Sequence, residues 1–175
     1  MKQIIEFINE KLVINKNTKI NKYHYHPKNE NELQNLIKQL IKKRGNEAVL
    51  NDIDTSKITN MSRLFLNSDF NGDISEWDVG NVKDMTSMFN HSKFNGNISM
   101  WDVSNVEDMG YMFFDSKFNG NISNWDVSNV KDMGYMFFLS KFNDDISKWD
   151  VSNVTNMYNM FYKCPLEKNL PKWYK

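Results

Sequence analysis

The residues best placed to do chemistry are carboxylates that recur at one fixed spacing. Asp54, Asp78, Asp102, Asp126 and Asp150 stand 24 residues apart. If successive units lie about 4.8 Å apart, as neighbouring strands do, each adjacent pair repels by roughly 0.9 kcal/mol in water. Two arrangements offset this repulsion. In an Asx-turn each carboxylate accepts backbone N–H groups, which is the favoured interpretation; a ladder of bound cations or a basic partner is the alternative.

Other side chains that do chemistry are sparse. His24 and His26 lie two residues apart, on one face of an extended segment, and no third metal ligand accompanies them. The single cysteine, Cys164, excludes an internal disulfide. The sequence has no glycine-rich phosphate loop, no zinc-ligand spacing and no nucleophile elbow. We therefore expect no catalytic residue, no metal and no cofactor, and a protein that is not an enzyme.

The elements that position the carboxylates belong to an internal repeat. All five tryptophans are 24 residues apart, and phenylalanine, isoleucine, valine and methionine recur in fixed phase with them. The tryptophans are Trp77, Trp101, Trp125, Trp149 and Trp173. Within one unit, Ile74, Trp77 and Val79 indicate a short extended stretch. Val82, Met85, Met88 and Phe89 follow at helical spacing. The pattern predicts stacked units of strand, turn and short helix, because no single unit buries its apolar residues alone.

The repeat resembles that of known surface proteins. The unit Ile-Ser-x-Trp-Asp-Val-Ser-Asn-Val-x-Asp-Met-x-x-Met-Phe-x-x-Ser-x-Phe-Asn looks like the repeat of mycoplasma surface lipoproteins. It is also similar to that of BspA-like leucine-rich-repeat surface proteins, and the resemblance covers residues 46–175. It implies an α/β, right-handed leucine-rich-repeat-like solenoid with a parallel strand ladder. It also implies adhesion or partner binding without catalysis, and a structural role for Cys164.

Composition divides the chain into three parts. Residues 46–175 form the repeats, with units at 46–69, 70–93, 94–117, 118–141, 142–165 and a truncated 166–175. Residues 23–45 are predicted to cap them, as an extended segment followed by a helix over 30–44. The apolar stripe of this helix consists of Leu33, Leu36, Ile37, Leu40 and Ile41, and Gly45 ends it. The first 45 residues carry a charge of 10 − 4 = +6, and the repeats carry 12 − 18 = −6. The two parts could attract each other, or the basic part an acidic partner.

Residues 1–22 form a separate N-terminal segment. Its apolar residues Ile4, Ile5, Ile8 and Leu12 share one helical face. Three interpretations stay open: a second helix packed on the cap, a helix that docks into a groove on another protein, or a membrane-surface helix. The segment also weakly resembles the N-termini of assorted proteins of large phages of gut bacteria. That resemblance implies an alternative function, a phage virion- or assembly-associated structural or cargo protein.

Repeat positions that vary between units are the candidates for partner binding, because packing does not fix them. One variable position holds Glu76, Met100, Asn124 and Lys148, beside the tryptophans. A second variable position holds Tyr111 and Tyr135, and a third holds Leu139. These three residues together could make an apolar contact patch. We expect a protein partner, with the chain a monomer or part of a larger assembly.

Charge and hydropathy limit the other partners. The chain has 22 basic and 22 acidic residues, and the repeat aromatics interleave with acids, which argues against nucleic acid. No apolar run approaches the ~20 residues of a membrane span. Charged residues interrupt the N-terminal apolar segment too early for a signal peptide. The expected location is cytoplasmic or virion-associated, with the cell surface implied only by analogy.

Overall fold

The computed structural model describes residues 22–174. Within this range the helices are α2 (Glu30–Arg44) and the 3-10 helix η1 (Pro165–Asn169). α2 begins where the Asn29 side chain accepts a hydrogen bond from the Glu32 N–H, and it ends at Gly45 (φ 88°), whose N–H donates to the Ile41 carbonyl. Residues 30–44 therefore form the helix expected of the cap, and Leu33, Ile37 and Leu40 are its buried side.

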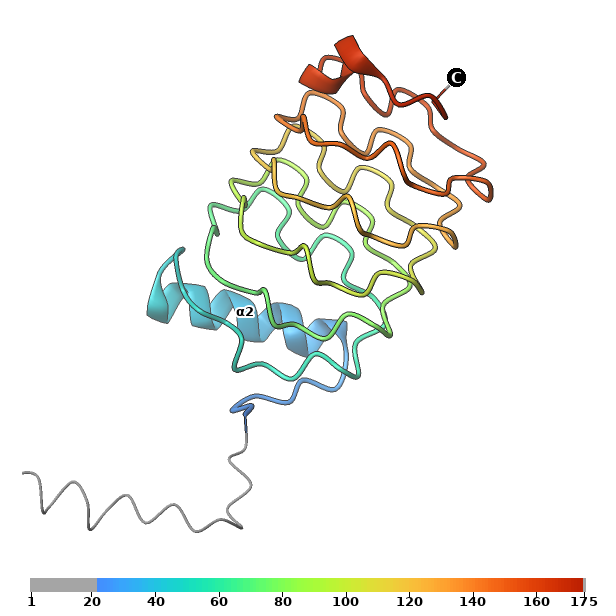
Figure 1. Ribbon diagram of the computed structural model, residues 1–175. Coiled ribbons are helices and arrows are strands. Elements are labelled where there is room, and N and C mark those ends of the chain that lie inside the picture. Colours follow the sequence, from blue (N-terminus) through green and yellow to red (C-terminus); the bar gives the residue numbers. More distant parts are fainter. Residues whose placement is uncertain (1–21, 175) are drawn as a thin grey trace, which may run out of the picture.

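Between α2 and η1 the chain runs through successive 24-residue coils that lie side by side (Figure 1). Backbone hydrogen bonds join equivalent positions of adjacent coils: the Met85 N–H donates to the Asp108 carbonyl, and the Met109 N–H to that of Asp132, both at 2.9 Å. The described part of the chain contains isolated parallel bridges instead of longer strands. One row of these bridges joins Asn60, Asp84, Asp108, Asp132 and Asn156 in order.

The segments expected to be short helices are tight turns. Ser87 and His91 have φ of 58° and 53°, in the left-handed region that a continuous α-helix does not enter. The Met88 N–H bonds back to Met85, whereas the Ser87 N–H donates to Gly110 of the next coil. Consecutive turns of this kind also point every third residue inward, which is why their apolar spacing resembles that of a helix. The extended stretch before each tryptophan is likewise a turn, as in the Trp101 N–H bond to Ile98.

Aromatic and aliphatic columns fill the interior of the stack. Phe94 and Phe118 are fully buried and stack in parallel at 6.3 Å. Trp125 is 4% exposed, and its indole N–H donates to the Ile98 carbonyl of the preceding coil at 3.2 Å. The same bond recurs for the other tryptophans, with Trp173 donating to Ile146 at 3.0 Å. Each indole therefore packs the core and adds a second hydrogen bond to a carbonyl that already accepts a backbone N–H in its own turn, as Ile98 does from Trp101.

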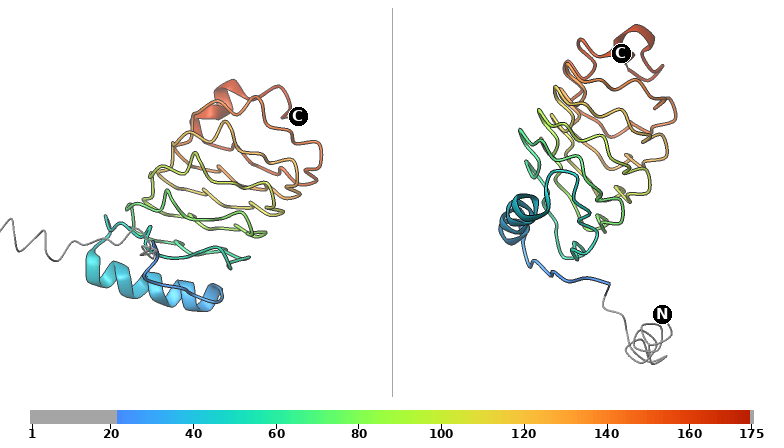
Figure 2. Two further views of the ribbon diagram at one scale, coloured as in Figure 1. Left: turned by 60° about the horizontal axis from the view of Figure 1, so that its bottom comes forward. Right: turned by 90° about the vertical axis from the view of Figure 1, so that its left-hand side faces the viewer.

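The two ends of the stack are closed differently (Figure 2). α2 lies across the first coil, where Tyr25 forms a parallel bridge with Ile53. Arg44 pairs with Asp52 through both guanidinium nitrogens, at 3.0 and 2.9 Å. At the other end η1 and the final turn cover the last full coil, with Leu166 buried at 7% exposure. The coils between them are therefore held in register at both ends.

Candidate interaction surface

A set of stacked aromatic side chains lies on the outside of the later coils. We call it the outer aromatic face; it consists of Tyr111, Phe114, Tyr135, Phe138, Tyr158 and Tyr162. These residues flank the inward-pointing Met and Phe of each turn, so the turns that bury the core also direct these rings outward. Tyr158 is 63% exposed and Tyr162 is 42% exposed. The face is therefore accessible along several coils.

The rings of this face are ordered against one another. Tyr111 and Tyr135 stack at 4.7 Å with 14° between their planes. Phe114 and Phe138 stack at 4.9 Å and 3°, and Tyr162 continues that column at 4.9 Å. Along these two columns the ring faces meet, so the stacked rings present edges and hydroxyl groups to solvent, whereas Tyr158 meets Tyr135 at 68°.

The backbone under this face adopts a conformation that aromatic residues disfavour. Tyr111 and Tyr135 have φ of 58° and 57°, where asparagine and glycine are favoured over bulky side chains. The equivalent position holds Ser87 and Asn159 in neighbouring coils, at the same sign of φ. Neither the backbone nor the core therefore requires tyrosine at these positions. Partial burial, reinforced by Tyr135, raises the pKa of the Tyr111 hydroxyl.

The residues singled out from the sequence fall on two separate turns. Tyr111 and Tyr135 belong to the outer aromatic face, and Leu139, 38% exposed, adjoins it in the same turn as Phe138. The other variable position lies on the exposed turn before each tryptophan, where Met100 is 85% exposed. That position holds Glu76, Met100, Asn124 and Lys148, all exposed.

Four members of the face were absent from the sequence-based set: Phe114, Phe138, Tyr158 and Tyr162. Phe114 and Phe138 follow the buried Phe113 and Phe137 directly. A Phe-Phe pair does not reveal which ring points outward. The sequence does mark the repeat position of Phe114 and Phe138 as variable. That position holds Leu66 and Asn90 in the earlier coils and an aromatic residue in each later coil.

A column of lysines borders the outer aromatic face. Lys93, Lys117 and Lys141 occupy one exposed position in successive coils. Lys93 pairs with Asp69 at 2.8 Å, whereas within residues 22–174 Lys117 and Lys141 have no ion-pair partner. The Lys163 ammonium lies 5.2 Å from the centre of the Tyr162 ring. Two exposed lysines on these turns therefore have no ion-pair partner among the described residues, although the repeats as a whole are acidic.

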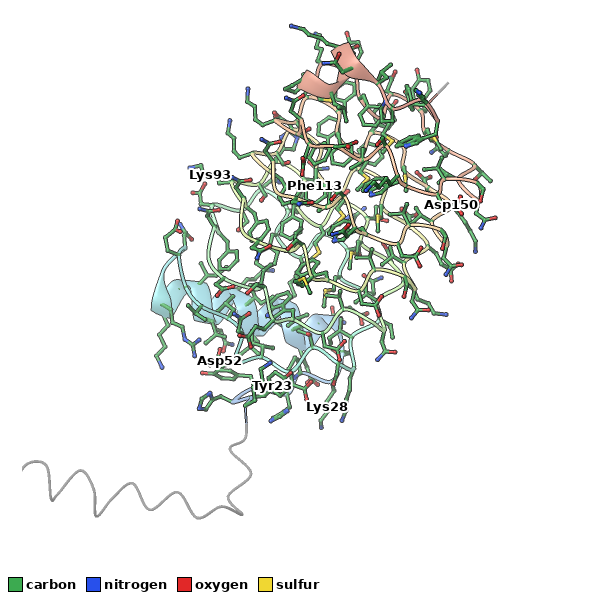
Figure 3. The ribbon with its side chains drawn as sticks, in the orientation of Figure 1. Tyr23, Lys28, Asp52, Lys93, Phe113 and Asp150 are labelled. Atoms are coloured by element: carbon green, nitrogen blue, oxygen red, sulfur yellow. The ribbon has the colours of Figure 1, made fainter. Side chains whose placement is uncertain are left out.

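The aspartate column lies on another edge of the stack. Figure 3 shows Lys93 and Asp150 at opposite sides, with Phe113 between them in the interior. Each carboxylate of the column accepts a backbone N–H two residues on: Ser56, Gly80, Ser104, Ser128 and Ser152 are the donors, at 3.0–3.1 Å. These are the Asx-turns of the favoured interpretation. The hydroxyl of Ser104 and its N–H lower the pKa of Asp102.

Asparagine columns complete the turns between coils. Asn105 and Asn129 donate from Nδ2 to the Gly80 and Ser104 carbonyls, both at 2.7 Å. The Asn119 N–H donates to the side-chain oxygen of Asn95 at 2.7 Å. These amides serve the backbone of the adjacent coil and are not free to bind a ligand.

The remaining candidates are two histidines and the single cysteine. His26 and Asp54 lie 3.1 Å apart, and His24 and Asp52 3.5 Å apart, so each histidine faces a carboxylate of the first coil. Cys164 is buried at 4% exposure, and this burial raises the pKa of its thiol. Among the residues that the structure describes, no group of three or more His, Cys, Asp or Glu side chains is arranged to hold a metal ion.

The N-terminal docking prediction cannot be placed on this surface. Ile4, Ile5, Ile8 and Leu12 lie outside the described residues. Of the helices between residues 22 and 174, none is both long and apolar enough to cross a membrane.

The stacked coils, with their side-chain columns repeating every 24 residues, define a tandem-repeat protein. The chain belongs to the family described as Mycoplasma protein of unknown function, DUF285, whose model matches residues 31–137 and 114–174. No curated protein and no solved structure matches the chain. Membership is compatible with a surface repeat protein and assigns no specific role.

Proposed function

We propose that this chain is a non-enzymatic interaction module: a right-handed, leucine-rich-repeat-like solenoid that binds a protein partner through its outer aromatic face. The stacking of 24-residue coils in parallel register supports the solenoid. Family membership is compatible with the adhesive surface role that the BspA-like resemblance implies. The single observation that carries the binding role is the outer aromatic face itself.

The fold does not require aromatic residues at the repeat positions of the outer aromatic face. The same positions hold Ser87 and Asn90 in the second coil, which stacks as well as the later coils do. Aromatic rings at these positions therefore add exposed apolar surface without serving the core. Contiguous exposed apolar patches mark interaction sites, and aromatic residues are enriched at the centres of protein interfaces.

Affinity capture with matched variants tests this function. Tyr111→Asn combined with Tyr135→Asn places at both sites the residue that stands naturally at Asn159, which suits the left-handed backbone. Met100→Asn is the control, because Asn124 occupies that position in the next coil. We expect the double variant to keep its fold and to lose a partner that the parent chain and the control both retain.

The outcome can contradict the proposal directly. If the double variant captures the same partners in the same amounts as the parent, the outer aromatic face is not the binding surface. A partner lost only on removal of residues 1–22 would instead favour the alternative, a virion- or assembly-associated protein docked through its N-terminal segment.

A further inference from the structure

The way the rings stack restricts what the outer aromatic face can bind. Nucleobases and sugar rings bind aromatic side chains through exposed ring faces. Here one face of each of Tyr111, Tyr135, Phe114 and Phe138 is covered by its stacking partner, at 4.7 and 4.9 Å, and Tyr162 stacks on Phe138 as well. The stacked rings present their edges, which are the electropositive part of an aromatic ring. This surface favours an anionic or hydrogen-bond-accepting partner group over a flat ring.

The charges around the face also favour an anionic partner group. Lys117 and Lys141 are exposed in adjacent coils and have no ion-pair partner in residues 22–174. Lys163 extends over Tyr162. Coils about 4.8 Å apart keep these ammonium groups close together, and a bound anion relieves their mutual repulsion.

The acidic groups nearest the face are already engaged, including Glu167 beside Tyr162, whose carboxylate accepts the Lys163 backbone N–H at 3.0 Å. Asp108 and Asp132 are half-buried, and each accepts a backbone N–H within its own turn, at 2.8 and 2.7 Å. Asp115, which does lie on the face, is 3.0 Å from the His91 ring nitrogen. The lysines therefore set the charge that an approaching partner meets.

We infer that the outer aromatic face binds an acidic peptide segment with interspersed apolar side chains, whose carboxylates meet Lys117, Lys141 and Lys163 while its apolar groups cover the aromatic ring edges. This inference rests on the proposed function and names its partner class. The lysines span successive coils, so at about 4.8 Å per coil and about 3.3 Å per extended residue the contact takes roughly four or five residues.

Fluorescence anisotropy with defined probes tests the inference on the full-length chain. The probe is a fluorescein-labelled decapeptide of alternating Glu and Phe. Its comparisons are the same peptide with Lys for Glu, the same peptide with Ser for Phe, and labelled 20-mer oligo-deoxythymidine. We expect the Glu/Phe peptide to bind at least tenfold more tightly than the other three, and its affinity to fall several-fold between 50 and 300 mM salt.

Two variants separate the contributions of charge and aromatic surface. Lys117→Gln combined with Lys141→Gln should weaken the Glu/Phe peptide at least fivefold, whereas Lys148→Asn, on the turn before Trp149, should leave its affinity unchanged. Circular dichroism establishes that each variant is folded. Tyr111→Asn with Tyr135→Asn should also weaken binding.

The remaining outcomes overturn the inference. They are tighter binding of the deoxythymidine 20-mer, equal binding of the Glu and Lys peptides, or no binding of the Glu/Phe peptide up to 1 mM. Loss of the captured partner on the tyrosine substitutions but not on the lysine substitutions would overturn the acidic partner and leave the proposed function standing. Retention of that partner by both variants would refute the proposed function itself.

Discussion

Replacing Trp125 by phenylalanine removes one defined hydrogen bond from the middle of the stack. The indole N–H donates to the Ile98 carbonyl at 3.2 Å, and both residues are buried, at 4% and 2% exposure. Phenylalanine has no donor at this position. The Ile98 carbonyl keeps the hydrogen bond from the Trp101 N–H at 3.2 Å and loses its second donor, the indole of the adjacent coil.

The expected loss of stability has two parts. Losing a buried hydrogen bond whose acceptor keeps another donor costs about 0.5–1.5 kcal/mol. Phenylalanine also buries roughly 50 Å² less apolar surface than tryptophan, which at ~25 cal/mol/Å² costs about 1 kcal/mol more. We therefore expect Trp125→Phe to lower the free energy of unfolding by about 1.5–2.5 kcal/mol.

Urea unfolding followed by circular dichroism measures this change. The matched control is Trp173→Phe, which removes the same bond, to the Ile146 carbonyl, at the end of the stack where the indole is only half-buried. Water can solvate that carbonyl more readily, so the control should lose clearly less stability. If Trp125→Phe loses less than about 0.5 kcal/mol, or no more than Trp173→Phe, the ladder of indole hydrogen bonds does not stabilise the stack.

Three further predictions concern other positions. Gly72→Ala should be strongly destabilising in thermal unfolding, because a Cβ there would overlap the Ala48 carbonyl oxygen, whereas Gly80→Ala meets no atom nearer than 3.4 Å and should be mild. Cys164 should react with a thiol reagent only on unfolding, since it is buried and its pKa is raised; rapid labelling of the native chain would contradict this. The pKa of Asp102 is lowered in the folded state, so the ionised carboxylate contributes stability above about pH 4, and this contribution is lost as the pH falls further. Asp102→Asn should therefore reduce the drop in melting temperature between pH 5 and 3. Calcium should raise the melting temperature of the parent chain by less than a degree.

The sequence indicated which residues are buried far better than which local structure they adopt. The 24-residue spacing identifies the inward columns, such as Trp101 and Phe94, because a stack must bury equivalent positions alike. The apolar stripe of α2 and the Gly45 that follows it locate that helix from the sequence. The sequence could not distinguish the turns at Ser87 from a short helix, because both conformations point every third residue inward.

The candidate surface was predicted only in part for a related reason. Tyr111 and Tyr135 vary against polar residues at the same position, which marks them as outside the core. Phe114 and Phe138 each stand beside a buried phenylalanine, and composition alone assigns such pairs to the core. Their outward direction goes with the tight turns in which the Phe114 and Phe138 N–H groups bond back to the Tyr111 and Tyr135 carbonyls, and the sequence does not specify these turns.

Site-specific photo-crosslinking tests the central claim most directly. A photoreactive phenylalanine analogue placed at Phe138 replaces one ring of the outer aromatic face, and the same analogue at Met100 labels the other exposed position. The account predicts a discrete crosslinked protein from position 138, competed away by excess unlabelled chain, and none from position 100. Crosslinking to the same protein from position 100 alone, or equally from both positions, would contradict it.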